Sequence, residues 1–106
     1  MYFLMICPHH DNIADLRDAL RPAHRAWVAS GGGGLARVLT GSALWDMTGA
    51  GIGNFGILEA ADEPSARAFA EGDPFAKGGV VSGVTLTRLA DSFQASRIQP
   101  LTVPQP

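Results

Sequence analysis

Hydrophobic residues recur along this chain with two spacings, one typical of strands and the other typical of helices. Short apolar or alternating runs, rich in β-branched and aromatic residues, predict four strands, at 2–7, 35–44, 52–60 and 80–89. Between the first two runs, apolar residues return every three or four positions, which predicts an amphipathic helix whose buried face carries Ile13, Leu16, Leu20, Ala23 and Trp27. Four glycines at 31–34 end this helix, because glycine adopts the left-handed backbone conformation without steric cost.

A second helix is predicted at 62–72, where DEPSARAFAEG opens with an acidic turn and a proline and closes with a glycine. The order of elements is therefore βαββαβ. This order is typical of an α+β, ferredoxin-like fold, in which a four-stranded antiparallel sheet has its first and third strands in the centre and both helices on one face. The other face is left bare, so we expect a homodimer that buries more than about 1,000 Å² of this apolar surface.

Composition narrows the possible partners and compartments. The chain has 106 residues, of which 46% are hydrophobic and 17% charged, as in an ordinary single globular domain. We expect that domain at 1–90, followed by an extended, proline-punctuated tail at 91–106. A net charge of −2 without any basic run argues against a nucleic-acid partner. One cysteine and an apolar N-terminus of only seven residues predict a cytoplasmic protein with no membrane partner.

The stretch RPAHRAW places a histidine, His24, two residues after a proline inside the first predicted helix. Taking about 100° per residue, His24 lies about 60° from the centre of the apolar stripe, at the border of the buried face. Arg17 lies near the same line two turns earlier, and Pro22 points to solvent. The proline either kinks the helix or begins a new helical segment. From this position alone, a border histidine without a chemical role is the better interpretation.

The stretch EGDPF contains the second candidate, Asp73, between the end of the second helix and a proline. An aspartate before a proline is typical of a helix N-cap, and on its own this is the better interpretation of Asp73. In a ferredoxin-like fold, however, the two helices lie side by side, so the end of the second can approach the border of the first. A carboxylate beside an imidazole holds one ring tautomer and raises its basicity.

Two further patterns carry less information. CPHHD (7–11) groups a thiol, two imidazoles and a carboxylate, but adjacent histidines point apart on an extended chain, so a surface loop is the better interpretation and no metal is predicted. GAGIGN (49–54) has Asn54 at the sixth position, where a dinucleotide-binding turn requires a glycine. It also precedes a strand, whereas that turn precedes a helix. We therefore expect no organic cofactor.

Four segments taken together resemble the YCII-related (YciI-like) family: RPAHRAW, LTGSAL, GNFGILEAADEPSARAFAEGDPFAKGGV and VTLTRL. The resemblance extends to about residue 89 and implies a dimeric α+β barrel, in which two ferredoxin-like sheets pack together. It also implies a His–Asp active site, which the matching segments place on His24 and Asp73. One activity in the family is dehydrochlorination of a chlorinated hydroxyhydroquinone. The chain departs from the family at Gly41-Ser42, where Gly-Pro is common, and in its tail after residue 90.

The resulting hypothesis is a small-molecule enzyme of the lyase, isomerase or dehalogenase type, with His24 as general acid/base and Asp73 orienting it. Arg21 or Arg17, together with Ser42, would bind an anionic oxygen of the substrate, and Phe75 completes the predicted substrate contacts. The alternative is a non-catalytic ligand-binding or interaction module, in which Asp73 only caps a helix. A cofactor-free monooxygenase is a third option that rests on fold analogy.

Overall fold

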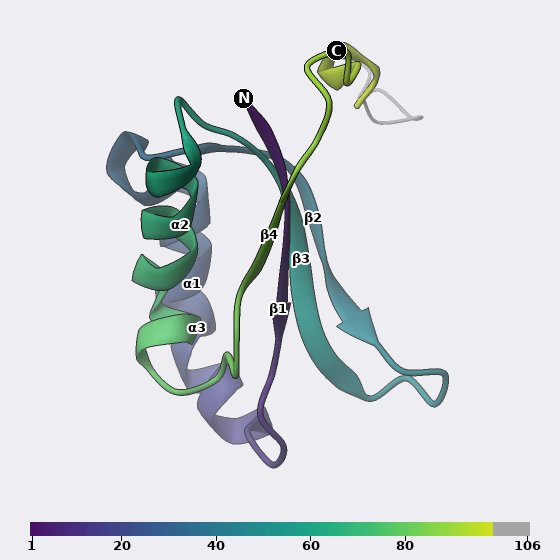
Figure 1. Ribbon diagram of the computed structural model, residues 1–106. Helices are drawn as coiled ribbons and strands as arrows, with labels where there is room; N and C mark the ends of the chain where they lie inside the picture. Colours follow the sequence, from purple (N-terminus) through teal and green to yellow (C-terminus); the bar gives the residue numbers. More distant parts are fainter. Residues whose placement is uncertain (99–106) are drawn as a thin grey trace, which may run out of the picture.

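A computed structural model describes residues 1–98 of the chain as one sheet covered by helices on one face (Figure 1). The strands are β1 (Tyr2–Pro8), β2 (Arg37–Trp45), β3 (Gly51–Glu59) and β4 (Thr85–Arg88). The helices are α1 (Ala14–Gly34), α2 (Glu63–Gly72) and α3 (Pro74–Lys77), and a 3₁₀ turn, η1 (Ala95–Arg97), follows β4. All pairings are antiparallel, in the order β2-β3-β1-β4, so β1 and β3 are central. The predicted ferredoxin-like α+β fold is confirmed.

The core lies between the sheet and the helices, and strict alternation along β1 supplies one side of it. Phe3, Met5 and Cys7 are buried toward the helices, whereas Ile6 faces the other way and is 37% exposed. From the helix side, α2 contributes Ala66, Phe69 and Ala70. Full burial of a large side chain such as Phe69 contributes roughly 1.5–3 kcal/mol, so these few residues hold α2 firmly on the sheet.

The inward face of α1 differs from the predicted one. Leu16 is 39% exposed and Ala23 is also exposed, although both belong to the apolar stripe. Before the glycine turn, the less exposed positions of the helix are Arg17, Leu20, Arg21, His24, Trp27 and Val28. At about 100° per residue, the centre of this set is rotated by about 60° from the apolar stripe and falls on His24. His24 therefore occupies the middle of the inward face, where the sequence pattern placed it at the border.

Helix α1 passes through Pro22 without interruption, so the proline does not begin a new segment. Pro22 is exposed, as predicted. The backbone leaves helical values at Gly31, Gly32, Gly33 and Gly34, whose φ angles are 61°, 67°, 77° and 97°. These glycines end the helix as expected and turn the chain toward β2.

The last strand is shorter than predicted: β4 covers only Thr85–Arg88 of the expected 80–89. Upstream of it, the backbone hydrogen-bonds to the α3 turn and to β1. The N–H groups of Val80 and Val81 both donate to the carbonyl oxygen of Phe75, and that of Ser82 donates to Pro8. Only a single bridge, between Val81 and His9, continues the sheet there. The segment 73–79, for which the sequence pattern predicted no helix, contains α3.

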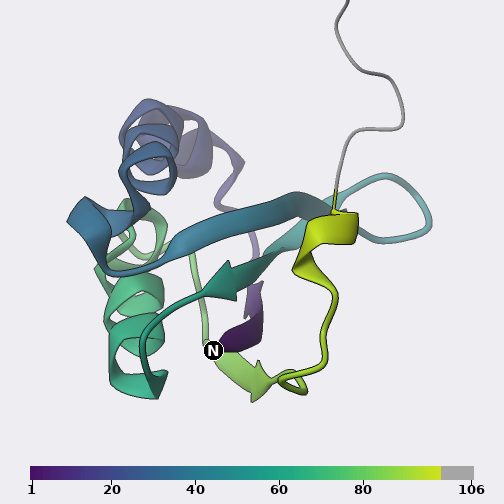
Figure 2. The same ribbon diagram turned by 90° about the horizontal axis from the view of Figure 1, so that it is seen from above.

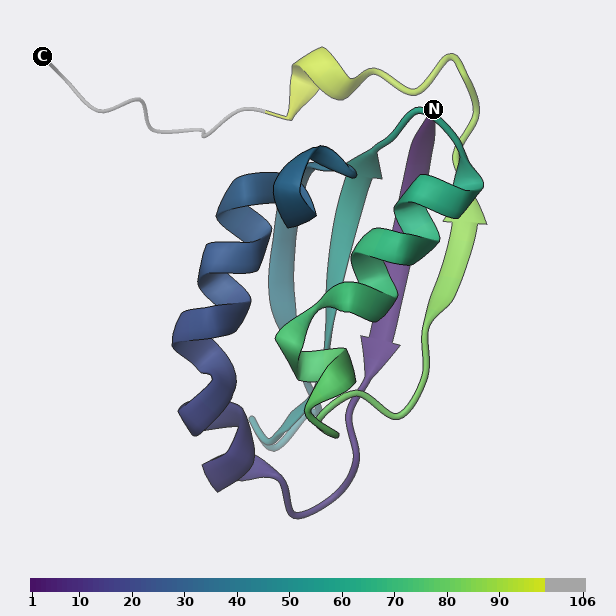
Figure 3. The ribbon, with the colours of Figure 1, turned by 90° about the vertical axis from the view of Figure 1, so that its left-hand side faces the viewer.

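After β4 the chain crosses one end of the sheet on the side away from the helices (Figures 2 and 3). The ring of Phe93 packs edge-on against Tyr2, with ring centroids 5.4 Å apart. The predicted extended tail at 91–106 therefore contains a short 3₁₀ turn, and its part from 99 onward lies outside the described residues. Within residues 1–98, none of the helices combines the length and apolar character needed to cross a bilayer.

The glycine turn after α1 generates a first testable prediction. A Cβ at Gly31 would run into the carbonyl oxygen of Ala36, whereas a Cβ at Gly33 would meet nothing within 4 Å. Both positions have positive φ, which costs an alanine roughly 1 kcal/mol. We expect Gly33→Ala to lower the free energy of unfolding by about that amount and Gly31→Ala by about 3 kcal/mol, because backbone overlap is added. Urea denaturation measures both, and equal losses would contradict the described turn.

Candidate active site

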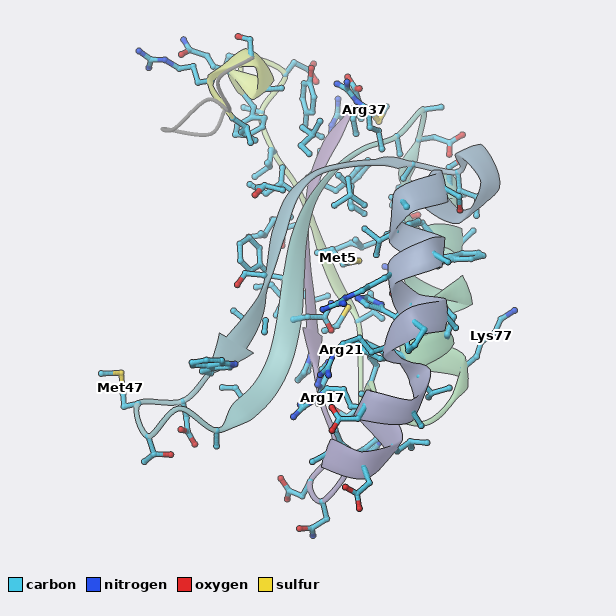
Figure 4. All side chains as sticks on the ribbon, turned by 180° about the vertical axis from the view of Figure 1, so that it is seen from behind. Met5, Arg17, Arg21, Arg37, Met47 and Lys77 are labelled. Carbon is cyan, nitrogen blue, oxygen red and sulfur yellow. The ribbon has the colours of Figure 1, made fainter. Side chains whose placement is uncertain are left out.

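A cleft of about 680 Å³ opens between α1 and the facing part of the sheet. Figure 4 shows Arg17 and Arg21 extending from α1 toward the strands, with Met5 of β1 pointing back toward the helices. The cleft is open because long polar side chains on the helix face very small residues on the strands. Among the lining residues are Arg17, Arg21 and His24 on the helix, and Gly41, Ala43 and Gly56 on β2 and β3.

His24 and Asp73 are in direct contact in the wall of this cleft. The Nδ1 atom of His24 lies 2.8 Å from both carboxylate oxygens of Asp73. Because a carboxylate only accepts, Nδ1 carries the proton and donates it. The side chain of His24 is 19% exposed and that of Asp73 is 8% exposed. Asp73 is thus a charged residue that is buried. The other ring nitrogen, Nε2, has no hydrogen-bond partner among residues 1–98.

Asp73 also caps α3, so both interpretations of this residue from the sequence describe real contacts. Its Oδ1 atom accepts the backbone N–H of Phe75 at 2.9 Å. Asp73 has φ −59° and ψ 133°, the extended conformation favoured before a proline, and Pro74 then begins the helix. The cap and the contact with the imidazole use the same carboxylate at the same time.

The approach of α2 to α1 brings Asp73 opposite His24. The indole Nε1–H of Trp27 on α1 donates to the carbonyl oxygen of Phe69 at 3.0 Å. Gly72, the last residue of α2, lies so close that a Cβ there would be 2.7 Å from the same indole ring. A glycine is therefore required at this position for the chain to leave α2 beside Trp27 and arrive at Asp73.

Phe75 supports the histidine ring. The two rings are stacked with centroids 3.9 Å apart and an angle of 5° between their planes. Phe75 is only 5% exposed, so one face of the imidazole is covered by a fixed aromatic ring. Phe75 lines the cleft, and the predicted substrate contact at this residue stays a prediction.

The two predicted arginines both line the cleft but differ in their partners. Arg21 forms an ion pair with Asp18 at 2.7 Å, one turn earlier on the exposed side of α1. Arg17 contacts no carboxylate within residues 1–98; its guanidinium approaches the ring of His9, with Nη1 3.3 Å from Nδ1. The structure thus brings Arg17, Arg21, His24, Asp73 and Phe75 around one cleft.

Ser42 also lines the cleft, but its side chain differs from that group in direction. It pairs with Phe55 on β3, and Phe55 pairs with Ile6 on β1. Directly opposed residues share a face, so Ser42 lies on the bare face of the sheet with Ile6. Its hydroxyl donates to the carbonyl oxygen of Ala43 at 2.9 Å. Although Ser42 is among the residues that line the cleft, this register turns its side chain away from His24.

His9 and Asn54 belong to the cleft although the sequence patterns gave them no role there. The Nε2 atom of His9 lies 2.7 Å from Oδ1 of Asn54. Burial lowers the pKa of His9 below its usual value, and the charges of Arg17 and His24 act in the same direction, whereas the Asn54 contact and the Asp73 charge oppose them. Trp45, 69% exposed, is a further lining residue that the sequence did not indicate.

The remaining members of the CPHHD segment point elsewhere. Cys7 is buried in the core, and burial followed by the charge of Asp73 raises the pKa of its thiol to about 11. His10 is exposed. No three histidine, cysteine, aspartate or glutamate side chains in the described part of the chain gather as a metal site would require.

An antiparallel four-stranded sheet with its helices on one face places the chain in the ferredoxin-like α+β class. The chain belongs to the YCII-related domain family, whose family model matches residues 1–90. Curated proteins include no significant match.

Among solved structures, the chain is similar to 5-chloro-2-hydroxyhydroquinone dehydrochlorinase from Burkholderia phenoliruptrix AC1100, determined in complex with 2,5-dihydroxybenzoquinone. The TM-score is 0.73 with 22% sequence identity, over 85% of this chain and 94% of the other. At this identity the similarity establishes a shared fold. The neighbour is an enzyme that acts on a small molecule.

The lowered pKa of His9 predicts how stability depends on pH. Because the folded state disfavours the protonated ring, the contribution of His9 to stability is complete above the unfolded pKa of about 6.5 and declines as the pH falls toward the folded value. We expect the difference in unfolding free energy between the wild type and His9→Gln to shrink between about pH 7.5 and about pH 5. Urea denaturation across this range measures it. A difference that stays constant or grows on acidification would contradict a neutral, half-buried His9.

Proposed function

We propose that this protein is a small-molecule enzyme in which His24 transfers a proton and Asp73 orients and stabilises it. The observation that carries the proposal is the contact between His24 Nδ1 and the buried Asp73 carboxylate, beside a cleft of ligand size. Clefts of about 300–1,000 Å³ are typical of small-molecule sites. The carboxylate engages Nδ1, which leaves Nε2 as the atom that exchanges a proton with a bound molecule.

The proposed chemistry is removal of a proton from an acidic O–H or C–H group. Nε2 takes the proton and the imidazole becomes an imidazolium, whose charge the Asp73 carboxylate balances at 2.8 Å. The proton is then returned to another atom of the substrate or to water. A positioned acid/base group of this kind contributes about 10²–10⁴-fold in rate. The step uses only side chains of this protein, in keeping with a lyase, isomerase or dehalogenase.

The named solved relative supports a flat, oxygen-rich ring as the class of substrate. It is a dehydrochlorinase of a chlorinated hydroxyhydroquinone, and its bound ligand is a dihydroxybenzoquinone. Rings of this kind carry acidic hydroxyl groups, which suit an imidazole base. The cleft of this protein offers the aromatic rings of Phe75 and Trp45 and the cation of Arg17 beside the histidine.

The experiment measures turnover of 5-chloro-2-hydroxyhydroquinone by chloride release, and deuterium incorporation from D₂O into 2,5-dihydroxybenzoquinone and related enols by NMR. We expect His24→Gln and Asp73→Asn each to lower the rate by about 10²–10⁴-fold. Asparagine still accepts the Phe75 N–H as a cap, so Asp73→Asn should leave the unfolding free energy nearly unchanged. His10→Gln, which removes an exposed histidine outside the cleft, should retain wild-type rates.

Two results would contradict the proposal. Turnover and exchange rates in both His24→Gln and Asp73→Asn that equal those of the wild type would show that the pair does not transfer the proton. Tight binding of these rings by the wild type, with no exchange and no chloride release, would instead support the non-catalytic ligand-binding module.

We also propose that two copies of the chain pair through the bare sheet face. The register places Leu4, Ile6, Phe55 and Ile57 together on that face, opposite to the helices. Ile6 lies near the centre of this face, on β1, which pairs with both β3 and β4. Its side chain is 37% exposed. A contiguous exposed apolar face of this kind typically marks a protein–protein interface. The same face of a second copy is equally apolar, so the two faces can bury one another.

Sedimentation velocity tests the pairing with two matched variants. Ile6 on the bare face and Leu16 on α1 are 37% and 39% exposed, so a glutamate costs each position a similar amount of apolar burial within the subunit. We expect the wild type and Leu16→Glu to sediment as dimers and Ile6→Glu as a monomer. A monomeric wild type at micromolar concentration, or an Ile6→Glu variant that remains dimeric, would contradict an interface on this face.

A further inference from the structure

A second polar cluster lies in the cleft beside the His24–Asp73 pair. It consists of His9 after β1, Asn54 on β3 and Arg17 on α1. His9 Nε2 is 2.7 Å from Asn54 Oδ1, and Arg17 Nη1 is 3.3 Å from His9 Nδ1. Three segments that are distant in sequence thus meet at one imidazole ring.

The direction of these hydrogen bonds follows from the chemistry of the groups. A guanidinium only donates, so Nδ1 of His9 must carry a lone pair and accept from Arg17. In the neutral ring the proton is then on Nε2, which donates to the amide oxygen of Asn54. The His9 ring contacts Arg17 and Asn54 and meets the ring of Phe75 edge-on. Burial together with the Arg17 charge favours the neutral form of His9. Each of the two ring nitrogens of His9 thus forms one hydrogen bond in the cluster.

Arg17 itself is held on a second side by the strand. A Cβ at Gly51 would lie 2.8 Å from Nη1 and 2.9 Å from Nη2 of Arg17, so the guanidinium packs against the bare backbone of β3. Arg17 is only half-exposed, and within residues 1–98 it forms no ion pair with a carboxylate. The ion pair of Arg21 with Asp18 distinguishes it from Arg17. Arg25 also lines the cleft and forms no ion pair with a carboxylate within residues 1–98, but its side chain is exposed, whereas Arg17 is held by His9 and Gly51. Arg17 is therefore the fixed cation of the cleft whose charge is not balanced by a carboxylate.

We infer that Arg17 binds an anionic oxygen of the substrate, a carboxylate or an ionised enol, and that His9 is the positioning residue that holds the guanidinium for it. The inference rests on the proposed function and adds to it the charge of the substrate and the residue that recognises it. His9 accepts one N–H of Arg17 and leaves its remaining donors available to the ligand.

Phe75 connects this anion site to the proton-transfer pair. Its ring stacks on His24 at 3.9 Å and meets the ring of His9 edge-on at 5.9 Å. Arg17 and His24 are seven residues apart on one helix, or about 10.5 Å along its axis. A ring-sized substrate that places an anionic oxygen on Arg17 can thus lie along α1 and present its acidic proton toward His24.

The test uses NMR to compare the binding affinities of benzoate and benzamide. These two probes have nearly equal shape but differ in charge. We expect the wild type to prefer benzoate, and Arg17→Gln to lower benzoate affinity about tenfold or more with benzamide changed less than about twofold. His9→Phe keeps an aromatic ring but removes the acceptor, and should lose several-fold in benzoate affinity alone. His9→Gln restores an acceptor and should recover most of it.

Controls separate this site from general charge effects and from the proton-transfer pair. Arg67→Gln removes one positive charge from an α2 residue that pairs with Glu63 and Glu71, and should leave benzoate affinity unchanged. Asp73→Asn should retain benzoate binding even where proton transfer is lost, so failure of the proposed function and failure of the anion site give different results. Nitrogen-15 NMR of the wild type should find the His9 proton on Nε2.

Several outcomes would overturn the inference. These are equal or absent binding of benzoate and benzamide by the wild type, unchanged benzoate affinity in Arg17→Gln, a His9→Phe variant that loses both probes equally, or a His9 proton on Nδ1. The third of these outcomes would show that His9 has only a structural role in the cleft.

Discussion

A carboxylate that is nearly sealed from water must find hydrogen-bond donors within the protein, and at Asp73 they come from two directions. The backbone N–H of Phe75 binds it from α3, and the His24 ring binds it from α1. The first contact begins a helix and the second joins that helix to its neighbour. Removing either donor would leave a buried negative charge partly unsatisfied, so the corner between α2 and α3 and the orientation of α1 depend on one another.

The cleft exists because the residues facing one another across the layers are mismatched in size. Toward its glycine end, α1 packs Trp27 against α2 and closes the core. Toward its beginning, the same inward face carries Arg17 and His24, and the strands opposite offer Gly41 and Gly56. Close packing at one end of the helix holds it at a fixed distance from the sheet, and small strand residues at the other end leave that distance unfilled.

Element order, strand order and the face that the helices cover were predictable because they follow from local periodicity and simple topology. The inward face of α1 was not, because a hydrophobic pattern assigns every polar residue to solvent, whereas His24 faces an internal cleft. The direction of the Ser42 side chain could not be read from alternation along its strand, because a bulge between Val38 and Thr40 inserts one extra residue and turns every later side chain to the other face. The role of His9 depends on partners from another strand and a helix, which no spacing along the chain reveals.

The stacking of His24 on Phe75 has a stereochemical consequence. With Nδ1 held by Asp73 and one ring face covered at 3.9 Å, the imidazole cannot turn over to exchange its two nitrogens without breaking both contacts. In the proposed reaction, a proton accepted at Nε2 would therefore leave from Nε2, on the same side of the bound molecule. The histidine would then act as a one-base catalyst, and a proton returned to the substrate would reach the same face of its ring from which the first was taken.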